Sequence, residues 1–195
     1  MLASIHPLGE RARGQRFWVT IAAYTVGSVV GAAALGALLG AIGQLLFDDG
    51  GTALRAAILG LGALAAVVLD RSGTRPPSWH RQVNEDWLAQ FRGWIYGAGF
   101  GSQLGLGIVT IVTTASVYLT WTGALIVANP LAGAVVGAGF GLARASPVVA
   151  SASLRTPVGV AARVRTLHEW DGRFRIVTVI GEATAACVAI IVATR

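Results

Sequence analysis

The residue of this sequence with the clearest chemical potential is Glu182, which lies within the apolar stretch IVTVIGEATAACVAII. Counted from Ile176, Glu182 lies about 9 Å along a helix, where an ionised carboxylate in a membrane is costly. A carboxyl group at such a depth commonly binds a cation, relays a proton or joins two helices. The alternative is a protonated glutamate that bonds to a neighbouring carbonyl group and has no further role.

Polar side chains in a second apolar stretch are the candidate partners of Glu182. Gln103, Thr110 and Thr114 recur at spacings of seven and four residues, which places them on one face if the stretch is helical. Tyr118 lies one further turn along the same stretch. We expect these side chains to line a path for a solute or ion with Glu182, although each threonine alone is also explained by a hydrogen bond to its own helix.

Other chemistries lack the residues that they need. The chain has one cysteine, Cys187, so it has no dithiol and no intramolecular disulfide. Its three histidines, His6, His80 and His168, share no spacing typical of a metal or haem site. The sequence contains no Walker A motif and no nucleophile elbow. It therefore predicts a protein without cofactor, metal or enzymatic activity.

Composition places these residues in a membrane. Of the 195 residues, 54% are apolar and 12% are charged, against about 25% charged in an average soluble domain. All 15 basic residues are arginines, and they fall in the short polar gaps between apolar runs rather than in one block. This is the pattern of a multi-pass membrane protein, and it argues against a nucleic-acid partner.

The elements that must position the candidate residues are five apolar runs. They cover residues 17–47, 51–70, 94–128, 131–150 and 174–194. Arginines gather before the first run, between the second and third, and between the fourth and fifth. We therefore predict an all-α bundle that crosses the bacterial inner membrane five times, with its N-terminus in the cytoplasm.

Two of the runs are longer than one crossing requires. As helices, residues 17–47 and 94–128 would reach about 46 and 52 Å, against a hydrocarbon core of about 30 Å. Each long run carries glycines and is followed by a tight turn and an ordinary span, which indicates two related halves, as in transporters with broken helices. A parallel repeat fits five crossings, whereas an inverted repeat needs a sixth crossing from a split of residues 94–128.

The same pattern divides a single membrane domain, residues 1–195, into segments. An interfacial loop joins two halves, and a further cytoplasmic loop precedes the last helix. The segments are a cytoplasmic segment at 1–16, a first half at 17–70, the interfacial loop at 71–93, a second half at 94–150, a cytoplasmic loop at 151–173 and a last transmembrane helix at 174–195.

The glycines of the second half allow two interpretations. They interrupt a helix, or, at spacings of four as in Gly101 and Gly105, they let neighbouring helices approach closely. The pentapeptide GAGFG occurs in both of the glycine groups concerned. The candidates for either role are Gly97, Gly99, Gly101, Gly105, Gly107, Gly137, Gly139 and Gly141.

An amphipathic segment at residues 79–94 leads into the third run. Its aromatic residues are spaced to reach one side of a helix, and its charged residues are available to lipid headgroups, which is typical of an interfacial helix. The expected membrane anchors are Trp79, Trp87, Phe91 and Trp94.

The stretches GAGFGSQLGLGIVTIVTTASVYL and AGAVVGAGFGLAR carry a family resemblance. Across residues 17–150 the chain resembles the small polytopic transporters that include lysine-exporter-like permeases and the thiol-relay membrane domains of cytochrome c biogenesis. In the thiol-relay domains each half carries one cysteine, whereas neither long run here contains a cysteine. The resemblance therefore implies a permease for a small solute or ion, and not a dithiol relay.

Taken together, these patterns predict a small transport protein of the inner membrane, with a path lined by glycine-broken helices. Its expected partners are the lipid bilayer, a small solute or ion, and either further copies of itself or another membrane protein. The alternative is a non-catalytic membrane subunit that assembles or stabilises a larger membrane complex.

Overall fold

A computed structural model describes residues 5, 7–47, 51–73, 76–77, 86–107, 112, 114–150 and 169–193, together with residues 156, 159, 162, 165 and 166. All regular structure in this part of the chain is helical, which confirms the predicted fold class. The helices are α1 (Pro7–Ala12), α2 (Phe17–Leu46), α3 (Thr52–Ser72), α4 (Trp87–Gln90), α5 (Gly93–Leu106), α6 (Ser116–Ile126), α7 (Pro130–Ala150) and α9 (Asp171–Ala193).

The long helices match the predicted apolar runs closely. In the described part of the chain, four helices are long and apolar enough to cross a membrane, namely α2, α3, α7 and α9, and α6 is a shorter apolar helix. Leucine, valine and isoleucine side chains remain exposed along these helices, as expected where the surrounding medium is lipid. The protein is therefore a multi-pass membrane protein.

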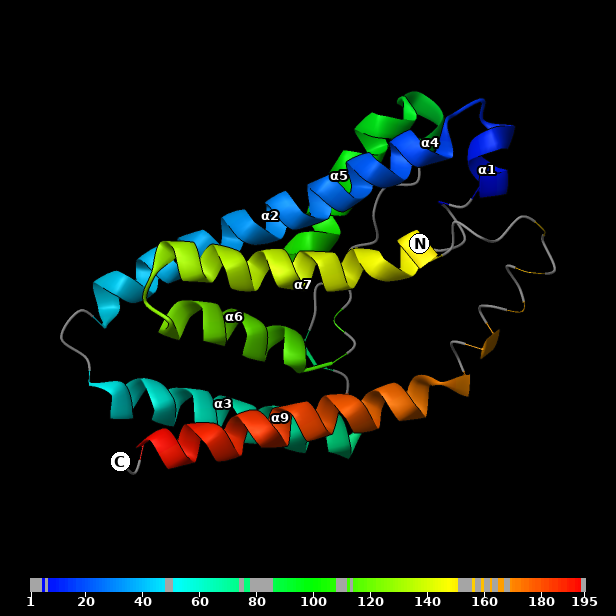
Figure 1. The fold of residues 1–195 in the computed structure, drawn as a ribbon. Helices are drawn as coiled ribbons and strands as arrows, with labels where there is room; N and C mark the ends of the chain where they lie inside the picture. Colours follow the sequence, from blue (N-terminus) through cyan, green and yellow to red (C-terminus); the bar gives the residue numbers. More distant parts are fainter. Residues whose placement is uncertain are drawn as a thin grey trace.

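The third apolar run is broken into two helices. Its first helix, α5, is capped by Gly107, which has a positive φ of 71°. Its second helix, α6, begins at Ser116. The two pieces are about 21 and 16 Å long, so neither alone crosses a hydrocarbon core of about 30 Å. Both pieces run in the same direction along α2 (Figure 1). Helices α5 and α6 therefore follow α2 one after the other in one direction, an arrangement that fits five crossings rather than six.

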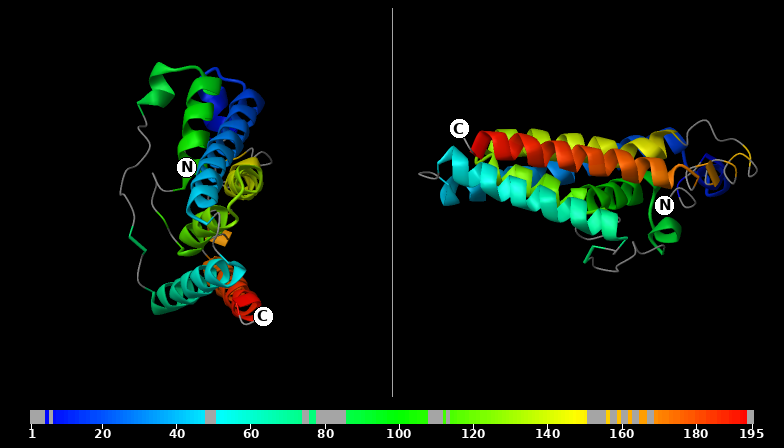
Figure 2. Two further views of the ribbon diagram at one scale, coloured as in Figure 1. Left: turned by 90° about the vertical axis from the view of Figure 1, so that its left-hand side faces the viewer. Right: turned by 90° about the horizontal axis from the view of Figure 1, so that it is seen from below.

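Helix α2 packs between α5 and α7 at the distance of direct backbone contact (Figure 2). A Cβ atom on Gly101 would overlap the carbonyl oxygen of Tyr24, and one on Gly137 would overlap that of Ala32. Gly97, Gly105 and Gly141 face carbonyl oxygens of α2 in the same way. These positions have no room for a side chain, so only glycine permits this approach.

Two of the candidate glycines face other surroundings. A Cβ atom on Gly99 would meet the ring of Trp87, and one on Gly139 would meet nothing within 4 Å. Of the eight candidates, Gly107 is the one at a helix end. Helix interruption and helix contact therefore fall on different glycines.

A second layer is formed by α3 and α9, which pack antiparallel against each other. Helix α6 lies between this pair and the α2–α5–α7 layer (Figures 1 and 2). The chain turns from α6 into α7 at Asn129, whose side-chain oxygen accepts a hydrogen bond from the Ala132 amide at 2.9 Å. Pro130 begins α7, where its missing N–H costs nothing. The division into two related halves and the segment boundaries stay predictions.

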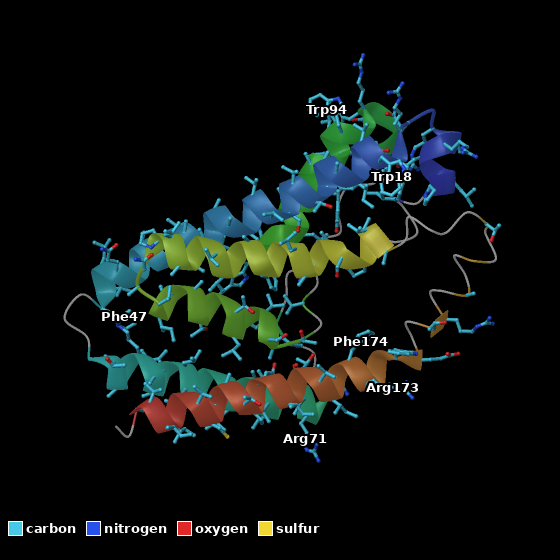
Figure 3. The ribbon with its side chains drawn as sticks, in the orientation of Figure 1. Trp18, Phe47, Arg71, Trp94, Arg173 and Phe174 are labelled. Carbon is cyan, nitrogen blue, oxygen red and sulfur yellow. The ribbon has the colours of Figure 1, made fainter. Side chains whose placement is uncertain are left out.

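The segment before α5 differs from the expected amphipathic helix. Trp79 lies outside the described residues, and α4 is interrupted at Phe91 and Arg92, which have extended backbones before α5 begins at Gly93. Phe91 and Trp94 are exposed, as a membrane anchor requires. Trp87 instead stacks on Phe100 of α5, with 6.0 Å between the ring centroids. In Figure 3, Trp18 and Trp94 lie toward the same end of the molecule as α1, and Phe47 lies at the opposite end.

Two glycines on one helix provide a matched test of the backbone contacts. We expect Gly137→Ala to lower the free energy of unfolding by about 1–3 kcal/mol, because its methyl group would overlap α2. Gly139→Ala should leave stability unchanged or raise it slightly, because that site is open and alanine favours a helix. Thermal unfolding in detergent, followed by tryptophan fluorescence, compares the two variants. Equal effects would contradict the packing described here.

Candidate functional site: a buried carboxyl pair

Two carboxyl groups are buried where α3 packs on α9. Glu182 of α9 is 2% exposed and Asp70 of α3 is 4% exposed. Asp70 is close enough to Glu182 to interact with it electrostatically and, when one of the two carboxyl groups is protonated, through a side-chain hydrogen bond. The structure thus gives Glu182 an acidic partner that was not expected from the sequence.

The helices bring these groups together because each carries a stripe of small buried residues. On α3 the stripe is Ala56, Gly60, Ala63 and Ala66, and Asp70 follows one turn later on the same face. On α9, Ala186 and Ala189 continue the face that Glu182 begins. Close packing of small side chains therefore directs both carboxyl groups into one interface.

One of the four carboxyl oxygens accepts a hydrogen bond from the backbone just before α6. Asp70 Oδ1 accepts a hydrogen bond from the backbone N–H of Ala115 at 2.8 Å, at the residue before α6 begins. Asp70 Oδ2 and both side-chain oxygens of Glu182 are buried and have no hydrogen-bond partner among the described residues. The site therefore presents three acceptor oxygens without donors.

The charges at this site are not balanced by a neighbouring base. Within the described residues, neither Asp70 nor Glu182 forms an ion pair, and the adjacent Arg71 is exposed. Two buried carboxylates cannot both be ionised at such proximity without a compensating charge. A shared proton or a bound cation would supply that charge.

Two of the other residues that the sequence predicts to line the path lie on the segment near the carboxyl pair. The Thr114 hydroxyl is paired with that of Ser116 at 2.7 Å, beside the Ala115 amide that binds Asp70. The Tyr118 hydroxyl donates to the carbonyl oxygen of Pro77, beyond the end of α3. Both residues thus lie on the segment that approaches the carboxyl pair.

Gln103 is not brought to Glu182. It is half-buried on α5, which packs against α2 and α7 in the other layer. Thr110 lies outside the described residues. The expected convergence of Gln103 with Glu182 is therefore not found in the described contacts.

A second buried acid, Glu10, has a structural role. Thr20 Oγ1 donates to Glu10 Oε2 at 2.6 Å, the Tyr96 hydroxyl donates to the same oxygen, and Arg13 forms an ion pair with Oε1 at 2.6 Å. Burial lowers the pKa of Arg13, but the hydrogen bond and charge of Glu10 raise it, and the net pKa lies above the ordinary value. These contacts hold α1 against α2 and α5.

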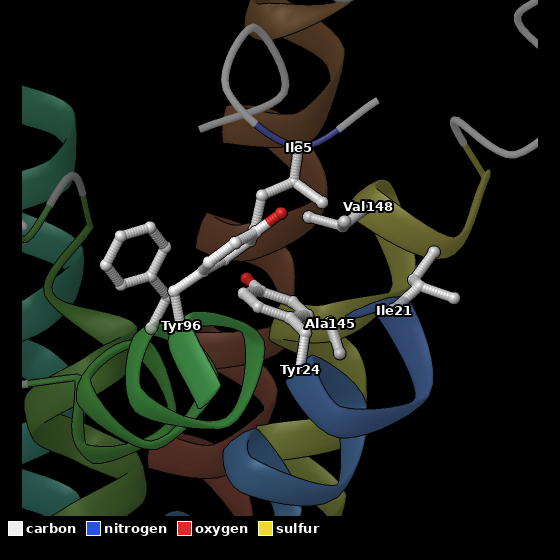
Figure 4. Close-up of a cluster of buried hydrophobic side chains, with 7 residues drawn as sticks. Ile5, Ile21, Tyr24, Tyr96, Ala145 and Val148 are labelled. Carbon is white, nitrogen blue, oxygen red and sulfur yellow. The ribbon is translucent and has the colours of Figure 1, made fainter. Parts of the chain in front are cut away.

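Apolar contacts support the same attachment. Ile5 is fully buried beside Tyr24, Tyr96 and Val148 at this end of the α2–α5–α7 layer (Figure 4). This cluster was not expected from the sequence, which predicts residues 1–16 only as a cytoplasmic segment. The pattern Glu10 followed by Arg13 three residues later was its only available signal.

A pair of substitutions at Asp70 tests its link to α6. Asp70→Ala removes the acceptor for the buried Ala115 N–H, and we expect unfolding free energy to fall by about 1–3 kcal/mol. Asp70→Asn keeps a side-chain oxygen at that place and removes a charge, so stability should stay unchanged or rise. The measurement is thermal unfolding of both variants in the same detergent. If they unfold alike, the Ala115 hydrogen bond does not stabilise the protein.

Comparison with known proteins places the chain in a family. Residues 2–180 match the family model described as cytochrome C biogenesis protein transmembrane region. Among relatives, the methylamine utilization protein MauF of Paracoccus versutus is 33% identical over 155 residues, which cover 75% of this chain and 55% of the relative. MauF of Paracoccus denitrificans is 32% identical over 154 residues, which cover 77% of this chain and 56% of the relative.

A third relative agrees with these two. MauF of Methylorubrum extorquens is 31% identical over 153 residues, with 75% of this chain and 53% of the relative covered. The chain thus spans about half the length of the curated relatives it matches. No solved structure matches it. The match supports the cytochrome c biogenesis side of the resemblance and not the lysine-exporter side. This chain belongs to the family of cytochrome c biogenesis transmembrane regions.

Proposed function

We propose that this protein transports a small cation or a proton across the bilayer through the region around Asp70 and Glu182. The observation that carries the proposal is the pair of buried carboxyl groups, with three unpartnered oxygens, on two facing membrane helices. Ionisable groups inside a membrane are expensive, and they typically mark ion or proton paths.

The break between α5 and α6 supports this location. An interrupted membrane helix leaves backbone polar groups that need partners, and such breaks are tolerated where they line a site. Here the Ala115 N–H at the start of α6 finds its partner in Asp70. A ligand that changed the hydrogen bonds of Asp70 would therefore act directly on α6.

The positions of two arginines support an orientation of the protein in the membrane. Arg71 lies in the last turn of α3 and Arg173 in the first turn of α9, and both lie away from the end at which Phe47 is found (Figure 3). We propose that the end with these arginines faces the cytoplasm of a bacterium and that the protein resides in the inner membrane. Asp70 lies within one turn of the end of α3, so the cytoplasmic route to the site would be short.

A dithiol relay is not part of the proposal, although the family is that of cytochrome c biogenesis. The single cysteine, Cys187, is exposed on α9 and has no second thiol in the chain. We also propose that the protein is not an enzyme, because among the described residues no hydroxyl or thiol group is hydrogen-bonded to Asp70 or Glu182 as a nucleophile would be to its base.

A second candidate function is that of a non-catalytic subunit in a larger membrane complex, either with copies of itself or with another protein. The relatives named as methylamine utilization proteins support it, because that name states a process and no transported solute. The open position at Gly139 is where a partner helix could approach. Gly139→Leu should then release the partner, and native mass spectrometry of membrane extracts would detect that release.

Flux measurements test the transport proposal. Proteoliposomes that enclose a pH-sensitive dye receive an imposed pH gradient, with sodium, potassium or methylammonium chloride outside. We expect a protein-dependent proton movement that Glu182→Gln and Asp70→Asn each reduce at least tenfold. Thr184→Val is the matched control, because Thr184 is exposed on the same helix and bonds only to its own backbone at Ile180. Flux that is equal in all four proteins would refute the proposal.

A further inference from the structure

We infer that the Asp70–Glu182 pair binds a small primary ammonium ion and exchanges it for a proton. The inference rests on the proposed transport function and names the class of ligand at the same site. Its starting point is the set of three buried oxygens, Asp70 Oδ2 and the two of Glu182, which have no donor among the described residues.

The number and kind of these groups fit an alkylammonium head. A primary ammonium group carries one positive charge and three N–H donors and has no acceptor, so it can meet one oxygen with each N–H. Calcium and magnesium ions instead take six or more oxygen ligands. Within the described residues, no group of three or more His, Cys, Asp or Glu side chains could hold a metal ion.

The neighbouring side chains suit a short alkyl group. One turn from each carboxyl is a buried alanine, Ala66 on α3 and Ala186 on α9. The carbon end of a small ligand would meet these methyl groups, whereas a long or branched chain would have to separate two helices that pack through small residues. A ligand of one or two carbons is therefore preferred.

The name of the relatives agrees with this class of ligand. They are named for methylamine utilization. At neutral pH methylamine is methylammonium, the smallest primary alkylammonium ion. The three oxygens can therefore accept hydrogen bonds from the three N–H groups of this ion.

Charge balance makes the exchange one for one. In the empty site one proton is shared between the two carboxyls, so the site carries one negative charge. When the ammonium ion binds, that proton leaves its O–H bond for solvent, both carboxylates are ionised, and the net charge of the occupied site is again minus one. No bond other than this O–H bond is broken, and no oxidant or reductant is required.

The titratable groups on the packed elements do not offer a competing proton source at the pair. Among the described side chains these groups are Arg55 and Arg71 on α3, Tyr118 on α6, and Arg173, Arg175 and Cys187 on α9. Tyr118 is bonded to Pro77 and Arg55 to Phe47, and Cys187 is exposed. Asp70 and Glu182 are therefore the groups expected to release the proton.

Calorimetric titration of the full chain in detergent with methylammonium chloride tests the inference. We expect one ion bound and one proton released per chain, the latter from titrations in buffers with different ionisation enthalpies. Tetramethylammonium, which has no N–H donor, should bind at least tenfold more weakly. Asp70→Asn and Glu182→Gln should each weaken methylammonium binding at least tenfold, and Thr184→Val should not.

The outcomes separate this inference from the transport proposal. Equal binding of methylammonium and tetramethylammonium, or binding without proton release, would overturn the inference without use of any variant. If methylammonium does not bind while Glu182-dependent proton flux persists in proteoliposomes, the ammonium inference fails and the transport proposal stands. If neither binding nor flux depends on Glu182, both fail.

Discussion

The carbonyl oxygens of Tyr24, Ser28 and Ala32 on α2 occupy the space that side chains would need at Gly101, Gly105 and Gly137. Lipid is as apolar as the helix surfaces, so helices in a bilayer associate through close packing rather than through the hydrophobic effect. Backbone contact of this kind fixes α5 and α7 against α2 with little freedom to slide. The remaining elements are placed relative to this three-helix layer.

The position of the carboxyl pair follows from that layer. Helix α5 is held along α2 as far as Gly105, and the positive φ of Gly107 then ends it. The chain resumes at α6, which packs against both layers, and the amide of Ala115, the residue before α6, bonds to Asp70. A change in the protonation or occupancy of Asp70 and Glu182 therefore bears on α6, which packs against α3 and α9 as well as against α2 and α7.

Some of this arrangement was predictable from the sequence. Hydropathy located the long helices, and an acidic residue in an apolar run identified Glu182. The partner was missed because Asp70 lies at the end of its run, where a charged residue ordinarily marks the exit of a helix from the membrane. The stripe of Ala56, Gly60, Ala63 and Ala66 would have placed Asp70 on a buried face.

Gln103 was assigned to the path for an identifiable reason. Spacings of seven and four residues place Gln103 and Thr114 on one face only if a single helix continues between them. The break after Gly107 removes that phase relation, so Thr114 lies beside Asp70 while Gln103 stays with α2 and α7. The glycines predicted a break in this run but did not identify the glycine at which the helix ends. In the sequence, a glycine that contacts a neighbouring helix cannot be told from one that ends a helix.

The most direct test of the central claim, that Asp70 and Glu182 act as one unit, is a double-mutant cycle for stability. Asp70→Asn, Glu182→Gln and the double variant are unfolded thermally under identical conditions. Coupled carboxyls predict that the second neutralisation changes stability far less than the first, with a coupling energy of about 0.5–3 kcal/mol. Additive effects, within about 0.5 kcal/mol, would contradict the account.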